Sequence, residues 1–464
     1  MKRFKIALVI PALLIAFIPS IAKAQPTNNC RIETSPWNIV SLGFPLKVER
    51  LANKTNPKIL ILPYQLKGEP EYTFTEVDKE SFNGAVRNIS QLSGNKSNVT
   101  LVFSEALELG QSAADLDFIK RNVQMTWQTD FEKSTFGFVT KTILAGDSKI
   151  DYKGIDAVVL FGSSQSKKEY IGEAMMFTND TSIKNNPKKS SGGSWWDPIK
   201  TSEGEISNAV LLYNDLSTDT ITHEIMHLYG LTDLYGSVSS PNFSIMATGG
   251  LKPATLLPYE KWVLGWLPDE SVTCVNSITE LSSNPADNRF TFDYSTGDKT
   301  LVIPTGSTTA LIVDVFNYQQ STYLQYYSLD NNARPPILRV TPGPLRLSNF
   351  RGVSTQFESP NYTLLISDND GSNVVINLIP TSGVNSVDSV QLITKAGSRK
   401  LEIDAMLIAK QEADAKAAAE LKAKKESDAK AAAVKKTTIT CVKGKLTKKV
   451  TTIKPVCPAG YKKK

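Results

Sequence analysis

The segment Thr222-His-Glu-Ile-Met-His-Leu-Tyr-Gly-Leu-Thr-Asp-Leu-Tyr235 carries the strongest signal in this chain. Within it His223 and His227 are four residues apart, so a helix of 3.6 residues per turn places both imidazoles on one face. Imidazoles in that arrangement can bind one metal ion, and Glu224 can then reach a metal-bound water without being a ligand itself. The segment therefore predicts a helical zinc site with two histidine ligands and Glu224 as the catalytic base.

The composition of the chain supports this interpretation. The protein contains only two histidines, and both belong to the segment. Gly230 follows the second histidine by three residues, where a left-handed glycine can end the helix and turn the chain back beneath the metal. Asp233 then becomes the candidate third ligand, although an aspartate in this place could also cap the helix or bond to the loop.

The start of the same helix is also marked. Ser217 or Thr218 is a suitable N-cap, and Asp219 would lie in the first turn, near the positive end of the helix dipole. The apolar side chains expected to face the core are Ile221, Ile225 and Leu228.

These residues resemble the zinc site of the immune inhibitor A metallopeptidases, the M6 family, whose pattern HExxHxxGxxD is related to the metzincin motif. Downstream, Ser244-Ile-Met246 resembles the Met-turn, in which Met246 would form an apolar floor under the ligands. The run from Leu257 to Trp266 resembles the segment that closes the catalytic domain in that family. The strong part of the resemblance spans Thr220 to Trp266, and it implies a zinc endopeptidase.

The resemblance leaves two features of the site open. Some metzincin relatives place a metal-binding tyrosine just after the Met-turn methionine, but Ala247 and Thr248 stand there in this chain. Tyr229 and Tyr235 are near in sequence, without a predicted position for their hydroxyls. Glu260, an acidic residue soon after the Met-turn, is the alternative to Asp233 as third zinc ligand. Calcium is a conceivable second cation, but no residue pattern supports it.

The N-terminus predicts export. Residues 1–24 have a basic start, an apolar stretch from Ile6 to Ile21 and the cleavage triplet Ala22-Lys-Ala24, so we expect a signal peptide and a mature chain beginning at Gln25. A retained membrane anchor is the alternative, which the prolines and the triplet disfavour. No other stretch approaches the ~20 apolar residues that a spanning helix needs, so we expect no transmembrane segment in the mature chain.

Four cysteines in an exported chain predict two disulfides. Sequence position suggests that Cys441 pairs with Cys457 in the tail and that Cys30 pairs with Cys274. Cys30 has an alternative role as a thiolate that covers the zinc in a latent form.

The charge of the chain is divided unevenly. From Lys435 to the end there are ten lysines and no acidic residue, whereas the whole chain carries +6. Without these lysines and the four basic residues of the leader, residues 25–434 carry −8. The tail resembles short Cys/Lys tails of exported actinobacterial proteins, which implies attachment to anionic cell-wall polymers or a membrane surface; a solubilising terminus is the alternative. Nucleic acid is excluded as a partner of an exported chain whose basic patch lacks interleaved aromatic residues.

The rest of the chain suggests an α/β (α+β), metzincin-like zinc protease domain, then an all-β sandwich-like domain, a helical spacer and a small basic hairpin tail. The expected boundaries are an irregular N-terminal segment at 25–50, the protease domain at 51–270, the β-sandwich-like domain at 271–404, the Ala/Lys/Glu-rich spacer at 405–436 and the disulfide-closed tail at 437–464.

Several elements are expected within the protease domain. Pro57–Tyr64, Phe136–Leu144 and Ile155–Gly162 read as strands, the first ended by its proline, and Leu116–Thr129 reads as a helix. Ile206–Tyr213 is a candidate edge strand for binding an extended substrate. The polar loop at Asn185–Lys200, with Trp195 and Trp196, is either a surface loop or a rim over the cleft.

Seven strands are expected in the second domain: Phe290–Tyr294, Thr300–Pro304, Ala310–Phe316, Ile337–Val340, Tyr362–Ser367, Val374–Leu378 and Val390–Ile393.

The sequence therefore favours a secreted zinc metalloendopeptidase that acts on extracellular proteins or peptides and is retained at the cell wall through its tail. Two other classes remain open. One is a wall-associated binding or adhesion protein whose protease domain has lapsed, and the other is a zinc hydrolase of a non-peptide substrate.

Overall fold

The fold is that of a computed structural model, which describes residues 27–34, 38–70, 74–116, 131, 134–162, 172–184, 196–212, 216–235, 243–248, 255–333, 336–340, 345–347, 357–358, 362–380, 387–433 and 436–464. The expected signal peptide, Trp195 and nearly all of the helix expected at Leu116–Thr129 lie outside the described residues.

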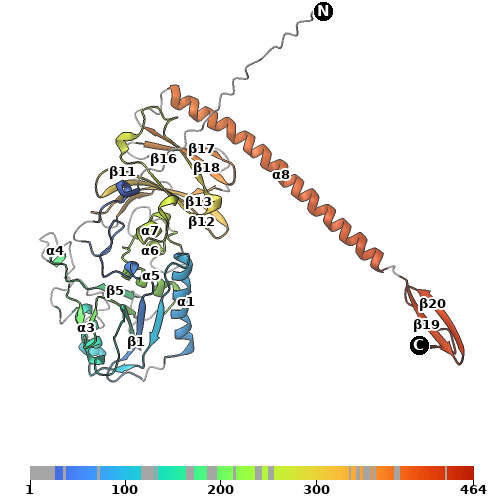
Figure 1. Ribbon diagram of the computed structural model, residues 1–464, viewed down its shortest axis with the longest axis horizontal. Coiled ribbons are helices and arrows are strands. Elements are labelled where there is room, and N and C mark those ends of the chain that lie inside the picture. Colours follow the sequence, from blue (N-terminus) through green and yellow to red (C-terminus); the bar gives the residue numbers. More distant parts are fainter. Residues whose placement is uncertain are drawn as a thin grey trace, which may run out of the picture.

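A mixed sheet lies at the centre of the first domain, in the order β2-β1-β4-β8-β5, with β3 also beside β1 (Figure 1). Its strands are β1 (Lys58–Gln65), β2 (Thr100–Phe103), β3 (Leu107–Glu108), β4 (Ala157–Gly162), β5 (Gly172–Met176) and β8 (Asn208–Leu212). All pairs are parallel except β5 with β8, which is antiparallel.

Helices cover both faces of this sheet. Alternate strand residues such as Ile59 and Val159 share a core with α1 (Glu76–Leu92) and α5 (Thr218–Tyr229), whereas Leu60 and Val158 pack with α3 (Thr135–Gly146) on the other face. This alternation follows from the two-residue side-chain period of a strand. The first domain is therefore a three-layer α/β structure.

Three expectations for this domain are wrong. Residues Phe136–Leu144 are not a strand but lie in α3, which starts at the N-cap Ser134 because the Ser134 hydroxyl accepts the N–H of Gly137. β1 does not end at its proline: Pro63 falls between the ladder with β2 and the ladder with β3, so it interrupts neither. β8, within the predicted edge strand, is an interior strand between β4 and β5.

Two antiparallel sheets make up most of the second domain. One has the order β14-β13-β12-β11-β9, with β15 beside β13, and the other has the order β10-β18-β17-β16; within the first, β9 joins β11 in parallel. A common core of apolar residues from both sheets, including Leu301, Val313, Ile366 and Ile376, lies between them. The strands are β9 (Val272–Cys274), β10 (Arg289–Asp293), β11 (Lys299–Pro304), β12 (Thr309–Tyr318), β13 (Ser321–Asp330), β14 (Ile337–Val340), β15 (Leu345–Arg346), β16 (Phe357–Glu358), β17 (Tyr362–Asn369) and β18 (Asn373–Pro380).

Short elements complete the two domains. They are α4 (Thr181–Lys184), β6 (Ile199–Lys200), β7 (Glu205–Ile206), α6 (Ile245–Thr248), α7 (Pro258–Val263), η1 (Thr27–Cys30), η2 (Leu51–Asn53), η3 (Ala113–Asp115), η5 (Asp269–Ser271), η6 (Ile278–Glu280) and η7 (Tyr294–Thr296).

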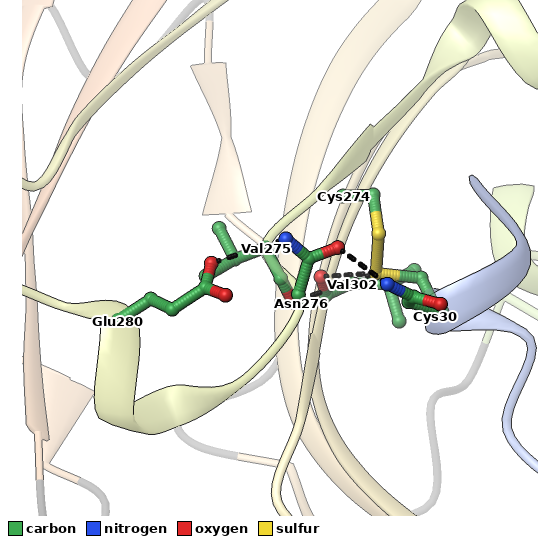
Figure 2. The surroundings of a disulfide bond; sticks show 7 residues. Cys30, Cys274, Val275, Asn276, Glu280 and Val302 are labelled. Atoms are coloured by element: carbon green, nitrogen blue, oxygen red, sulfur yellow. Dashed lines mark hydrogen bonds between the residues drawn. A yellow bond between two sulfur atoms is a disulfide. The ribbon is translucent and has the colours of Figure 1, made fainter. Parts of the chain in front are cut away.

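The N-terminal segment ties the two domains together. The predicted disulfide between Cys30 and Cys274 is present, and it joins η1 to β9 (Figure 2). Farther along, the N–H of Glu33 donates to the carbonyl of Ser307 in the second domain, and the N–H of Ser41 donates to the carbonyl of Gly230 at the end of α5. The segment expected to be irregular therefore bridges both domains.

A long helix leads to the C-terminal tail. α8 (Val387–Ala433) projects away from the two domains and carries at its far end a hairpin of β19 (Thr437–Lys443) and β20 (Leu446–Thr452), with β21 (Lys462–Lys463) beside β19 (Figure 1). The predicted disulfide between Cys441 and Cys457 closes this hairpin. The strand expected at Val390–Ile393 is wrong, because these residues belong to α8, which starts well before the predicted spacer.

None of the helices in the described part of the chain combines the length and the hydropathy needed to cross a bilayer.

Candidate metal centre

Both ends of α5 are fixed by local contacts that the sequence predicts. The hydroxyl of Ser217 accepts the N–H of Thr220 at 3.2 Å, which caps the N-terminus. At the other end Gly230 adopts φ 115°, in the left-handed region, and its N–H reaches the carbonyls of Met226 and His227. A Cβ on Gly230 would lie 3.1 Å from the side chain of Leu46. The turn after α5 therefore requires glycine for its conformation and is tight in space.

The two histidines and Asp233 converge at this turn. One potential ligand atom from each of the three residues lies within 4.8 Å of the other two. The Asp233 Oδ1 atom is 3.4 Å from Nε2 of His223 and 3.1 Å from Nε2 of His227. The structure therefore brings together the three ligands proposed from the sequence.

The other ring nitrogen of each histidine faces a backbone carbonyl. Nδ1 of His223 is 3.0 Å from the Ile245 oxygen, and Nδ1 of His227 is 2.8 Å from the Leu231 oxygen. A carbonyl only accepts, so each Nδ1 carries the proton, and in the neutral ring the Nε2 lone pair faces Asp233. When both rings are neutral, the two Nε2 lone pairs and a carboxylate oxygen form a donor set that fits a divalent cation such as zinc.

The electrostatics of Asp233 and His227 agree with a site that attracts cations. Burial alone would raise the pKa of Asp233, but the nearby His227 and His223 bring it far below its usual range. Burial alone would lower the pKa of His227, but Asp233 and Glu224 raise it to about 9. Without a metal, a proton therefore occupies part of the cluster, and a metal ion must displace it.

Glu224 lies beside the cluster and under the last strand of the sheet. Its side chain is buried, and burial is the largest cause of a raised pKa, which the two histidines and a backbone hydrogen bond from Ala174 oppose. A Cβ on Gly172 would come within 2.7 Å of the Glu224 carboxylate. Glu224 is thus enclosed between α5 and β5, as a carboxylate whose affinity for a proton is increased.

The structure places the two tyrosines that the sequence left unplaced. Tyr235 accompanies the cluster: its ring stacks on His223 with centroids 6.1 Å apart, burial and the nearby Asp233 raise the pKa of its hydroxyl, and 49% of its surface is exposed. Tyr229 is buried, and its hydroxyl lies 2.5 Å from Ser97 Oγ. In the sequence, the only indication that Tyr235 lies near the site was its position two residues after Asp233.

Met246 and Glu260 lie behind the metal cluster. Met246 is fully buried in α6, and its carbonyl accepts the N–H of Leu234, next to Asp233. Glu260 is also fully buried, but its two oxygens accept bonds from Ser244 Oγ and the Leu257 N–H. Among the described residues, the group that could hold a metal ion consists of His223, His227 and Asp233, so the structure does not bring Glu260 in as the alternative third ligand.

Two further alternatives do not agree with the structure. Cys30 is bonded to Cys274, so it cannot serve as a thiolate over the metal. The last strand beside α5 is β5 and not β8, so β5 has the place at the sheet edge that was predicted for Ile206–Tyr213. In the predicted loop, Trp196 packs edge-to-face on Phe131, with centroids 4.7 Å apart.

Neither a protein-family model nor a curated protein matches this chain. The class of the site is therefore defined by its own residues: two histidines and an aspartate whose potential ligand atoms converge, with a buried glutamate on the same helix as the histidines.

Proposed function

We propose that the protein is a secreted zinc-dependent endopeptidase, related to the M6 metallopeptidases, that hydrolyses peptide bonds of extracellular proteins. The observation that carries the proposal is the convergence of the two histidine Nε2 atoms and Asp233 beside the buried Glu224. Two disulfides agree with an exported chain.

Each residue has a distinct task in this proposal. His223, His227 and Asp233 hold the zinc, which when bound supplies a Lewis acid and lowers the pKa of a coordinated water to about 7. Glu224 accepts the proton of the attacking water and delivers it to the leaving amine, a role typically worth about 10² to 10⁴ in rate. Burial raises the pKa of the Glu224 carboxyl, which favours the uptake of a proton.

Tyr235 supplies a hydrogen-bond donor on the open side of the cluster. Asp233 raises the pKa of its hydroxyl, and the side chain is half exposed, so a substrate carbonyl bound at the cluster would lie within the reach of this side chain. A donor at that place stabilises negative charge that develops on the carbonyl oxygen.

The test is a comparison of Glu224→Gln with the wild type and with Glu270→Gln, which changes an exposed carboxylate outside the site. We expect the wild type and Glu270→Gln to bind one zinc and to cleave unfolded casein, and a chelator to abolish cleavage. Glu224→Gln should retain zinc and lose turnover.

The other classes of function predict different results. An adhesion protein with a lapsed protease domain would leave casein intact. A zinc hydrolase of a non-peptide substrate would bind zinc and leave casein intact, while hydrolysing small esters or amides. Full activity of Glu224→Gln would exclude the proposed mechanism in either case.

We also propose that the tail holds the enzyme on an anionic cell-wall polymer. The described lysines of the hairpin are exposed, including Lys448 and Lys449 on β20, and the hairpin stands at the end of a 47-residue helix. Charge attraction of this kind weakens with salt. Retention of the full chain on isolated anionic walls should fall as salt rises, and changing both lysines to glutamine should reduce it. Salt-independent retention would contradict the proposal.

A further inference from the structure

A chain of three hydrogen bonds joins a buried carboxylate to the first histidine of the cluster. Ser244 Oγ donates to Glu260 Oε1 at 2.9 Å, and the N–H of Met246 donates to Ser244 Oγ at 3.1 Å. The carbonyl of Ile245 then accepts the Nδ1 proton of His223 at 3.0 Å. All the side-chain members of this chain are buried.

The middle of this chain is a single peptide unit. The Ile245 carbonyl and the Met246 N–H belong to the same planar peptide group and point in opposite directions. Ser244 holds the N–H end of that plane, so it helps to fix the direction of the carbonyl that faces His223. The carbonyl end of the same plane also accepts the Thr248 hydroxyl at 3.3 Å, whereas the N–H of Ile245, which donates to the Thr255 carbonyl, belongs to the preceding peptide plane.

Glu260 determines which way the Ser244 hydroxyl points. Because the carboxylate accepts the hydroxyl proton, a lone pair of Ser244 Oγ is left for the N–H of Met246. Glu260 is itself held at its other oxygen, which accepts the N–H of Leu257 at 2.7 Å in the first turn of α7. The carboxylate is therefore fixed from two sides and has no exposed surface.

We propose that Glu260 is a positioning residue of the metal centre, which sets the ring orientation of His223 through Ser244 and the Ile245–Met246 peptide. This inference rests on the proposed metal site and adds a residue that does not touch the metal. A group that orients a ligand in this way typically changes metal affinity by about 10- to 100-fold when it is removed.

The second histidine supplies an internal comparison. Nδ1 of His227 donates to the carbonyl of Leu231, one residue after Gly230, and no bond of the Glu260 chain reaches that turn. Loss of the Glu260 chain should therefore disturb His223 and leave His227 unchanged. A general loosening of the fold would disturb both.

The protein is well suited to the measurement because it has only two histidines. Labelling the full-length protein with ¹⁵N-histidine gives two imidazoles, whose nitrogen shifts report the tautomer and the hydrogen bond of each ring. The variants are Ser244→Ala, which removes the hydroxyl, and Glu260→Gln, which keeps the size and removes one acceptor. Asp314→Asn is the matched control: Asp314 is a buried carboxylate near α7 that accepts from Tyr327 and has no bond to Ser244.

We expect the metal-free Ser244→Ala and Glu260→Gln proteins to show a changed Nδ1 signal for His223 and a wild-type signal for His227. Their zinc affinity, measured by competition with a chelating dye, should fall by about 10- to 100-fold, and that of Asp314→Asn should not. Unchanged His223 signals in both variants would overturn the inference, as would equal changes in both histidines of Ser244→Ala.

The metal-free spectra keep this test separate from the proposed function. If the protein bound no zinc, the proposed metal site would be refuted. The His223 signal would still show whether Glu260 orients the ring. A chain that binds zinc and cleaves casein, but whose His223 is insensitive to Ser244→Ala and Glu260→Gln, would refute only the role of Glu260.

Discussion

The ring of Tyr235 stacks on the ring of His223, with centroids 6.1 Å apart and planes inclined by 29°. Asp233 also raises the pKa of the same tyrosine, so Tyr235 lies beside two of the three proposed ligands. A tyrosine that only packed against the protein would not need to expose half of its surface beside the metal cluster. The arrangement leads to the first prediction.

Replacing Tyr235 with phenylalanine should lower kcat by about 10² to 10³, because one donor to the developing oxyanion is lost while the ring remains. Zinc content should stay at one per chain. Tyr229→Phe is the matched control: it removes a hydroxyl that bonds to Ser97, so it should keep kcat and lose about 1 kcal/mol of stability. Equal kcat in the two variants would show that Tyr235 has no part in the chemistry.

Replacing Gly230 with valine should lower zinc affinity although no ligand is changed. The left-handed φ of 115° disfavours a β-branched residue, and a Cβ would meet Leu46 at 3.1 Å. The turn that carries Asp233 must shift to relieve this, at a cost of about 1–3 kcal/mol. Zinc titration and thermal unfolding check the prediction, with Gly297→Val as a control because Gly297 also has a positive φ but lies in the second domain. If Gly297→Val lowered zinc affinity as much, the effect would not be specific to the turn.

Replacing Gly172 with alanine should reduce kcat and leave zinc bound. A Cβ at this position would lie 2.7 Å from the Glu224 carboxylate, so either the carboxylate or β5 must move. A misplaced catalytic base impairs proton transfer more than it impairs metal binding. Kinetics with matched zinc analysis distinguish the two effects, and loss of zinc in proportion to activity would contradict this account.

Asp314 should make the protein less stable as the pH rises. Burial raises the pKa of Asp314 to about 7, above the value of 3.8 for an unhindered aspartate. A group whose pKa is raised in the folded state contributes its stabilisation below the unfolded pKa and loses it as the pH rises through the folded pKa. Between pH 4 and pH 8, ionisation of Asp314 should therefore lower the free energy of unfolding by up to about 4 kcal/mol.

The comparison with Asp314→Asn isolates that contribution. Unfolding of both proteins by denaturant at several pH values should show a smaller loss of stability on going to pH 8 in the variant. Parallel pH profiles for the two proteins would mean that Asp314 titrates normally.

Helix α5 and the two disulfides could be predicted because their signals are local, or because few other residues of the chain could take the same part. Ser217 and Gly230 define the two ends of α5 by their own hydrogen bonds, and four cysteines allow few pairings. Two histidines in the whole chain left little choice for the ligands. These features required no knowledge of how distant segments pack.

Other features depend on tertiary structure. The apolar residues of α3 fit a strand as well as a helix, because Phe136, Val139 and Ile143 have helical spacing within an alternating run. The placement of β8 inside the sheet depends on which strand joins it, and β5 gives no edge signal in the sequence. The sequence could not show whether Glu260 is a metal ligand or a buried hydrogen-bond acceptor, because its role depends on where α7 packs in the fold.

The bond between Cys30 and Cys274 encloses almost the whole first domain in one covalent ring, and the two cysteines are 244 positions apart in the sequence. A single cut of the backbone anywhere inside this ring would leave the two fragments attached until the disulfide was reduced. If the protein is the protease proposed above, cleavage by its own copies inside the ring would not release the proposed metal ligands.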